Sequence, residues 1–257
     1  MRKVALCFMA HPDDCEFFAA GTLALLAQRG WEIHIASSTA GDGGSLDKGP
    51  LEIARVRRAE NVISAQVIGA TYHCLELQDV YVTFDAASIR RAINLVRSIA
   101  PTLMFTHAQQ DYMLDHEITA QLARAASNAF VAPNLGNGPM TPGASIPHLY
   151  YSDPVACLDH DGNLAPTSVV VDITTVYKTK MQMLCAHASQ RDWLKAHYGI
   201  DEYTRSLDNW SAKRGATIGV PHAEGFRQHR GYGYPSECLL KEVLGELAVS
   251  QMLTGKQ

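Results

Sequence analysis

Two short segments of the sequence bring together side chains that bind metal ions and transfer protons. The first is AHPDD, in which His11, Asp13 and Asp14 follow an apolar run at residues 4–9. The second is THAQQDYMLDHE, which contains His116 and also follows an apolar run. Two histidines and one carboxylate, with an open position for water, form a known catalytic zinc site. We therefore expect His11, one of the two aspartates and His116 to bind a metal ion, while the other aspartate faces the bound water.

Each segment also has a purely structural interpretation. Aspartate is favoured at the N-cap of a helix, where it complements the helix dipole, so Asp13 or Asp14, and separately Asp115, could serve as caps. His107 ends a strand-like run and could be a hydrogen-bonded core histidine. Charge next to a buried strand is costly unless it is paired. The combination of His, Pro and two Asp after such a strand therefore favours a functional site over a cap.

The elements that must position these side chains alternate between strand and helix patterns. Continuous apolar runs predict buried strands, and Ala- and Leu-rich segments that end at Gly or Pro predict helices. Strands are expected at residues 4–9, 31–37, 72–77 and 102–106, and helices at 17–29, 51–68, 88–100 and 118–130. The alternation predicts an α/β protein with a Rossmann-like three-layer α/β/α fold and a mostly parallel sheet. Ligands bind such sheets beyond the carboxyl ends of the strands, where the strand order reverses. Adjacent first and fourth strands would therefore join the two segments in one crevice.

The pattern changes after residue 131. A Pro- and Gly-rich loop comes first, and two strand-like runs, a long helical segment and a C-terminal helix follow it. These features are expected at residues 132–147, 148–153, 168–173, 175–197 and 235–252. We expect a single domain over residues 1–257. In it, residues 1–131 form the Rossmann-like core, and residues 132–257 form a C-terminal mixed region of loop, additional strands and helices packed on that core.

Composition excludes several classes of protein. The 257 residues are 47% hydrophobic and 19% charged, with a formal net charge of −4 and no basic stripe, so nucleic acid is not an expected partner. No stretch approaches the ~20 apolar residues of a membrane span. The six cysteines form no C-x-x-C pair, which favours free thiols in a reducing compartment. We expect a soluble cytoplasmic protein that acts on a small molecule.

With these segments in view, the chain resembles the LmbE-like (PIG-L) zinc-dependent N-acetylglucosaminide deacetylases. The resemblance rests first on AHPDD and the segment GTLALLAQRGWEIHIASSTAGDGG after it, and it covers most of the chain. Further matching motifs are RRAE at residues 57–60, FTH at 105–107, DH at 115–116, VDIT at 171–174, AHASQ at 186–190 and AEGF at 223–226. For His222, Glu224 and His229 near the last motif, the spacing does not indicate a second metal site, and a structural hydrogen-bond role is expected.

The resemblance implies roles for individual residues. It places the Zn²⁺ ligands, one ion per subunit, on His11, Asp14 and His116, and the general base on Asp13. The family arginine near the substrate matches Arg57, with Arg55 and Arg58 as competing positions. The loop at residues 39–45, which contains Asp42, is expected to border the substrate. The resemblance also implies a homo-oligomer, either a trimer or a hexamer.

One position departs from the family pattern. Members commonly carry His-Pro-Asp-His before the helix, where the first His stabilises the oxyanion or delivers a proton, whereas this chain reads Met-Leu-Asp-His with Met113 first. Methionine does neither job. Tyr112 or His187 could replace that acid, and Asp115 could instead orient a ligand imidazole.

The expected function is therefore metal-dependent hydrolysis that removes an acetyl or other acyl group from an N-acetylated amino sugar or related amide. A zinc-activated water would attack with an Asp general base. The alternative is a metal-dependent hydratase or lyase acting on an unsaturated carboxylic acid with the same fold. A nucleotide-binding module is disfavoured because the first turn lacks G-x-G-x-x-G, and a Ser-His-Asp hydrolase because no G-x-S-x-G elbow is present.

Overall fold

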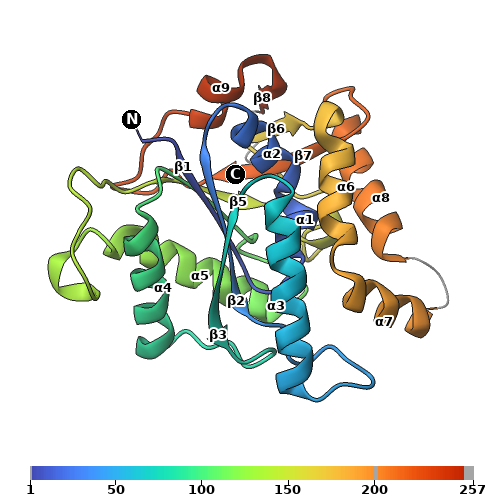
Figure 1. Ribbon diagram of the computed structural model, residues 1–257. Coiled ribbons are helices and arrows are strands. Elements are labelled where there is room, and N and C mark those ends of the chain that lie inside the picture. The colour runs from blue at the N-terminus through green and yellow to red at the C-terminus, as the bar shows by residue number, and fades with distance from the viewer. Residues whose placement is uncertain (1, 199–201, 252–257) are drawn as a thin grey trace.

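The computed structural model describes residues 2–198 and 202–251, which form a sheet with helices on both faces (Figure 1). The strands lie in the order β3-β2-β1-β4-β5-β7-β6-β8. Pairing is parallel from β3 to β5 and antiparallel from β5 to β8. The strands are β1 Val4–Met9, β2 Glu32–Thr39, β3 Thr71–Leu77, β4 Leu103–Thr106, β5 His148–Ser152, β6 Val169–Asp172, β7 Ala223–Gln228 and β8 Ala248–Ser250.

Helices cover the sheet in two layers, and α4 and α5 lie on one face while α2, α3 and α6 lie on the other (Figure 1). The α-helices are α1 Asp14–Phe18, α2 Ala20–Gln28, α3 Pro50–Gln66, α4 Ala86–Ile99, α5 Leu114–Ala129, α6 Tyr177–Cys185, α7 Ala188–Tyr198, α8 Glu202–Ala216 and α9 Leu239–Leu244. The mostly parallel α/β architecture expected from the sequence is confirmed.

The central strand β1 explains why the sheet needs both layers. Ala5, Cys7 and Met9 point into the core shared with α2 and α6, whereas Leu6 and Phe8 point into the core shared with α4 and α5. All five side chains are fully buried. This is the alternation of a strand covered on both faces, and it accounts for the continuous apolar run in the sequence.

The strand order reverses at β1, because β2 pairs on one side of it and β4 on the other. The chain leaves β1 in a sharp turn to α1, and Asp13 in that turn has the left-handed backbone angle φ 93°. Aspartate tolerates this region better than most residues. The AHPDD turn therefore lies at the reversal point, where ligands of open α/β sheets bind.

Several elements differ from the sequence-based expectations. The helix expected at 17–29 is two helices, α1 and α2, separated at Ala19, whose backbone angles are not helical. The segment expected to be one helix at 175–197 is broken between α6 and α7, with His187 at the break. The expected C-terminal helix at 235–252 is wrong over most of its described length, because α9 ends at Leu244 before Gly245, which has φ 62°, and β8 then pairs with β6. Residue 252 of that expectation lies outside the described residues.

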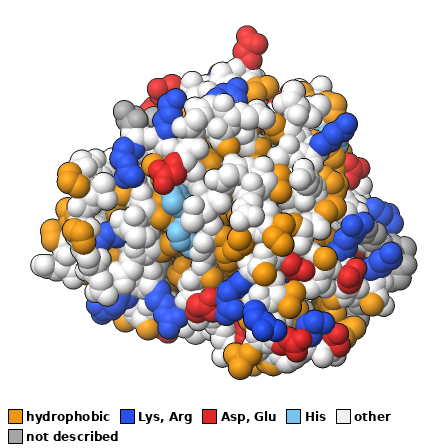
Figure 2. Space-filling model, viewed as in Figure 1, with side chains coloured by type: hydrophobic (Ala, Val, Ile, Leu, Met, Phe, Trp, Pro, Cys, Tyr) orange, Lys and Arg blue, Asp and Glu red, His pale blue; other side chains and the backbone are white. Residues whose placement is uncertain are grey.

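Within the described residues, no helix is both long and apolar enough to cross a membrane. On the face in Figure 2, Lys and Arg side chains intermingle with Asp and Glu over the region of α3, without a broad field of one sign. Such mixed charge is typical of a solvated helix surface.

Candidate metal centre

Three side chains at the carboxyl end of the sheet form a group that could hold one metal ion. His11 and Asp14 come from the turn after β1, and His116 comes from the first turn of α5. Each offers a ligand atom within 4.8 Å of the others, and all three are buried. Asp14 Oδ2 lies 3.3 Å from His11 Nδ1, and Asp14 Oδ1 lies 3.5 Å from His116 Nε2. The structure thus brings together the three residues that the sequence indicated as ligands.

The far side of each imidazole meets a carboxylate. His11 Nε2 lies 3.1 Å from Asp79 Oδ1 and 3.2 Å from Asp115 Oδ2. His116 Nδ1 lies 3.3 Å from Asp111 Oδ2. Carboxylates in this position set the tautomer and increase the basicity of the nitrogen that faces a metal. The set of two nitrogens and one carboxylate oxygen therefore fits a zinc-type ion, with His11 Nδ1 and His116 Nε2 directed at Asp14.

Two further groups of potential ligands overlap with this one, namely His107, Asp111 and His116, and His11, Asp79 and Asp115. His107 stacks on His116 with ring centroids 3.9 Å apart, and its Nε2 accepts the backbone N–H of Ala10. Burial lowers the pKa of His107 to about 4, which keeps the ring neutral. His11, Asp14 and His116 all line a cavity of about 790 Å³, whereas His107, Asp111 and Asp115 do not. The first group is therefore the one that a substrate can reach.

Asp13 and Asp14 are neighbours in sequence with different electrostatic surroundings. Burial raises the pKa of Asp13, and the positive charge of Arg57 offsets only part of that effect. Burial also opposes the charge of Asp14, but the nearby His116 and hydrogen bonds from other imidazoles hold the pKa of Asp14 well below its usual value. Asp14 is thus a stable anion suited to a metal, and Asp13 is the carboxylate better suited to accept a proton.

Asp13 lines the cavity and is held by two side chains. The Tyr203 hydroxyl donates to Asp13 Oδ2 at 2.7 Å, and Arg57 Nη2 lies 3.6 Å from the same oxygen. Both of these contacts are to Oδ2. Asp13 lies next to the ligand group and is not a member of it.

Arg57 connects the turn after β1 with the loop after β2. Its guanidinium donates to the Pro12 carbonyl at 2.9 Å and to the Gly41 carbonyl at 3.2 Å. Arg57 is buried and lines the cavity. Arg58 instead forms an ion pair with Glu76 at 2.6 Å. Of the three arginines considered from the sequence, only Arg57 lines the cavity.

The remaining sequence candidates have distinct positions. Tyr112 lines the cavity, and its ring lies edge-on to His116 at 5.8 Å. Asp115 accepts the backbone N–H of Val80 in addition to facing His11. His187 is fully buried with its Nε2 3.2 Å from Glu16 Oε1, and it does not line the cavity. Asp42 accepts the backbone N–H of Asp79 at 3.0 Å and so supports the rim.

Sequence reasoning missed Asp79 and Tyr203. Asp79 follows the carboxyl end of β3, and its place after a parallel strand was an available signal. Tyr203 lies at the start of α8, 190 positions from the Asp13 that it contacts, and no local pattern indicates its role.

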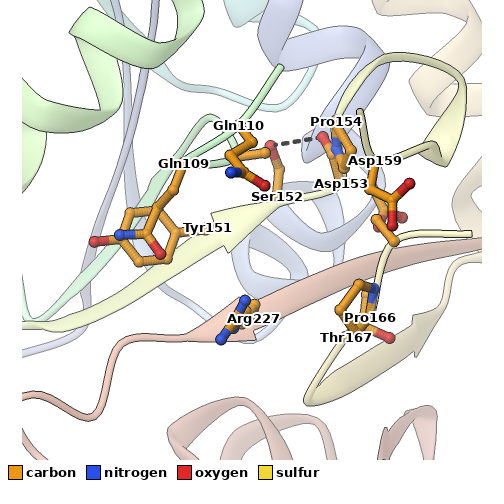
Figure 3. Close-up of a pocket in the computed structure, with 12 residues that line it drawn as sticks. Gln109, Gln110, Tyr151, Ser152, Asp153, Pro154, Asp159, Pro166, Thr167 and Arg227 are labelled. Atoms are coloured by element: carbon orange, nitrogen blue, oxygen red, sulfur yellow. Dashed lines mark hydrogen bonds between the residues drawn. The ribbon is translucent and has the colours of Figure 1, made fainter. Parts of the chain in front are cut away.

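A second cavity of about 430 Å³ is bordered by Gln109 and Gln110, by Tyr151 of β5 and by Arg227 of β7 (Figure 3). It contains no member of the three potential metal groups.

Comparisons with known proteins concern the family and the fold. Residues 6–127 match the family PIG-L, described as GlcNAc-PI de-N-acetylase. The N,N'-diacetylchitobiose deacetylase from Pyrococcus horikoshii has a similar structure, with a TM-score of 0.74 and 24% identity over 88% of this chain and 84% of that chain.

Hydratases are also similar to this chain. The 4-oxalmesaconate hydratase of Pseudomonas putida is 27% identical over 199 residues, which are 74% of this chain and 74% of that protein. The structure of a 4-carboxy-2-hydroxymuconate hydratase from Pseudomonas putida has a TM-score of 0.72 and 21% identity over 93% of this chain and all of that one. Structural likeness at these identities establishes the fold, and the family match covers the segment that carries all three potential ligands. Residues 6–127 therefore match the PIG-L, or LmbE-like, family of enzymes, as the sequence motifs indicated.

Proposed function

We propose that this protein is a metal-dependent hydrolase that removes an acyl group from an N-acylated amino sugar or a related amide. The observation that carries the proposal is the placement of His11, Asp14 and His116 around one point on a cavity wall, with Asp13 beside them. The deacetylase from Pyrococcus horikoshii supports the same reaction type.

A zinc-type ion held by His11, Asp14 and His116 would supply a Lewis acid that polarises the amide carbonyl and lowers the pKa of water. Asp13 accepts the proton of the attacking water at Oδ1, while Tyr203 and Arg57 hold the carboxylate in place. Burial raises the pKa of Asp13, which favours its acceptance of that proton.

The leaving amine needs a proton donor, and Met113 stands where the family has histidine. Tyr112 is the candidate donor on the cavity wall, because its ring contacts His116 and its hydroxyl belongs to an exposed side chain. His187 lies behind Asp13 and is paired with Glu16. We therefore propose Tyr112 as the acid and a supporting role for His187.

Two joined measurements test the function. Elemental analysis of the purified protein should find close to one zinc-type ion per chain, and the loaded protein should release amine and acetate in equal amounts from N-acetylated sugars. A fluorescent amine reagent detects the first product. A fully loaded protein that releases neither product from any N-acyl amine would contradict the proposal.

Hydration of an unsaturated acid is the second candidate, and the 27% identity to 4-oxalmesaconate hydratase favours it. The cavity charge argues against it. Asp13, Asp14, Asp79 and Glu202 line the cavity, and Arg57 is the one Lys or Arg among the described lining residues. Away from the metal ion, these carboxylates would repel a substrate that carries several carboxylates, whereas a neutral amide carries no charge to be repelled. Water addition across a double bond, followed by ultraviolet absorbance, distinguishes the two reactions.

We further propose that residues 1–257 act as a single domain and that the protein works as a cytoplasmic trimer or hexamer. Size-exclusion chromatography with light scattering tests the oligomer. A monomer at micromolar concentration would contradict it.

A further inference from the structure

One side of the metal-site cavity is an aromatic wall, which consists of Phe17, Phe18, Trp193, Leu194, Tyr203 and Trp210. Phe17 meets Tyr203 edge-on at 5.2 Å and lies 5.1 Å from Trp210. Trp210 in turn stacks on Phe18 with ring planes 12° apart. Phe18 lies edge-on to His116 at 6.2 Å, so the aromatic wall begins at one of the potential metal ligands.

The other histidine adjoins a polar rim. His11 contacts Asp79, and Asp79 Oδ2 accepts the backbone N–H of Gly43 at 3.1 Å. Arg57 holds the same loop through the Gly41 carbonyl. The two sides of the cavity thus differ in chemistry, with hydrogen-bonding groups next to His11 and apolar rings next to His116.

An amide that binds between the two histidines presents one substituent to each side, and its nitrogen stays between them, next to Tyr112, which lines the cavity and lies edge-on to His116. The hydroxyl groups of an amino sugar need hydrogen-bond partners, which the polar rim offers. The rings of the aromatic wall offer few, since the Tyr203 hydroxyl is already engaged with Asp13, and the polar groups that α8 adds to the cavity lining are Glu202 and Ser206. Burying an apolar group there is favourable by ~0.8 kcal/mol per methylene.

We propose that the aromatic wall receives the acyl group, and that the group removed is therefore longer or more aromatic than acetyl. This inference rests on the proposed amide hydrolysis. The cavity volume of about 790 Å³ leaves room for an acyl group larger than acetyl.

The test compares N-acetyl-, N-butyryl-, N-hexanoyl- and N-benzoylglucosamine as substrates of the zinc-loaded protein. Along the straight-chain series, kcat/KM should increase about fourfold per added methylene, which is ~0.8 kcal/mol converted to a rate. Leu194→Ser on α7 should flatten the series, because it should lower kcat/KM more for the hexanoyl compound than for the acetyl compound. Leu51→Ser is the matched control, because this leucine is 89% exposed and lies outside the cavity. It should leave the increase of kcat/KM with acyl length unchanged.

A binding measurement distinguishes a failure of this inference from a failure of the proposed function. Calorimetry on Asp13→Asn, in which turnover is slowed, should show tighter binding of N-hexanoyl- than of N-acetylglucosamine, and Leu194→Ser in that background should remove the difference. If no amide is hydrolysed but this difference in binding persists, the inferred role of the aromatic wall is supported and the proposed deacylase function is contradicted. If N-acetylglucosamine is hydrolysed and bound as well as every longer member, the inference is overturned while the function stands. If binding or turnover improves only for aryl N-acetylglucosaminides, the apolar group binds on the amine side. That result would also overturn the inference.

Discussion

The substitution Asp13→Asn tests whether Asp13 acts as the base while other residues bind the metal. Asparagine has nearly the same shape as aspartate and no basic oxygen. The three potential metal ligands are untouched, so metal content should stay at the wild-type level. Tyr203 can still donate to the amide oxygen at the Oδ2 position. Loss of a general base costs ~10²–10⁴ in rate, or about 3–5 kcal/mol in the activation barrier.

The same variant has an expected sign for stability. Burial raises the pKa of Asp13 above its ordinary value, so at neutral pH the fold holds an ionised group that it disfavours. A neutral isostere relieves that cost, and Arg57 keeps its bonds to the Pro12 and Gly41 carbonyls. The melting temperature should therefore match or exceed that of the wild type, while kcat falls.

The assay is amine release at saturating substrate, with elemental analysis and thermal unfolding on the same preparations. Asp47→Asn is the control, because Asp47 is an exposed carboxylate in the loop after β2 and its side chain is 75% exposed. If zinc occupancy falls, added zinc restores it before the rate is measured. A kcat within threefold of the wild type in fully loaded Asp13→Asn would refute the assignment of Asp13 as base.

Three further outcomes are expected. Asp111→Asn and Asp115→Asn should each weaken zinc affinity about 10–100-fold in a chelator competition, because each carboxylate faces the far nitrogen of a ligand histidine. Unchanged affinity in both variants would show that these carboxylates do not support the ligand histidines. Tyr112→Phe should lower kcat by ~10² or more and leave KM close to the wild-type value, and a variant with full kcat would exclude Tyr112 as the acid. Asp153→Asn should destabilise the fold by about 3–5 kcal/mol in urea unfolding, because the buried Arg214 donates to both oxygens of Asp153 and would lose its charged partner, whereas Arg57 lies 3.6 Å from Asp13 and bonds to carbonyls instead. A loss under ~1 kcal/mol would contradict that reasoning.

The parallel half of the fold was predictable because its signals are local. A buried strand such as β1 needs apolar residues on both faces, and helices such as α3 end at glycine-containing turns, so length and composition identify them. The meeting of His11 with His116 also followed from topology, since adjacent parallel strands end at the same edge of the sheet.

The C-terminal half was less predictable because its elements depend on distant partners. β7 contains the AEGF motif, which is not strand-like by composition, and it forms because β5 and β6 pair with it on both sides. Glu224 in β7 accepts the N–H groups of Gly21 and Thr22 and forms an ion pair with Lys180. The structural hydrogen-bond role expected for Glu224 is confirmed, although no sequence spacing indicates its partners.

The two adjacent aspartates show how backbone geometry, rather than residue type, can assign different chemistry. With φ at 93°, Asp13 turns away from the direction that Asp14 takes, so the first carboxylate meets Tyr203 and Arg57 while the second meets the imidazoles. The pKa of Asp13 is raised and that of Asp14 is lowered. Environments that separate two carboxylates in this way are typical of an acid–base residue next to a charged partner. A change that removes the left-handed turn at Asp13 should therefore remove the difference in pKa between the two aspartates, even when both carboxylates are kept. The proposed reaction depends on that difference.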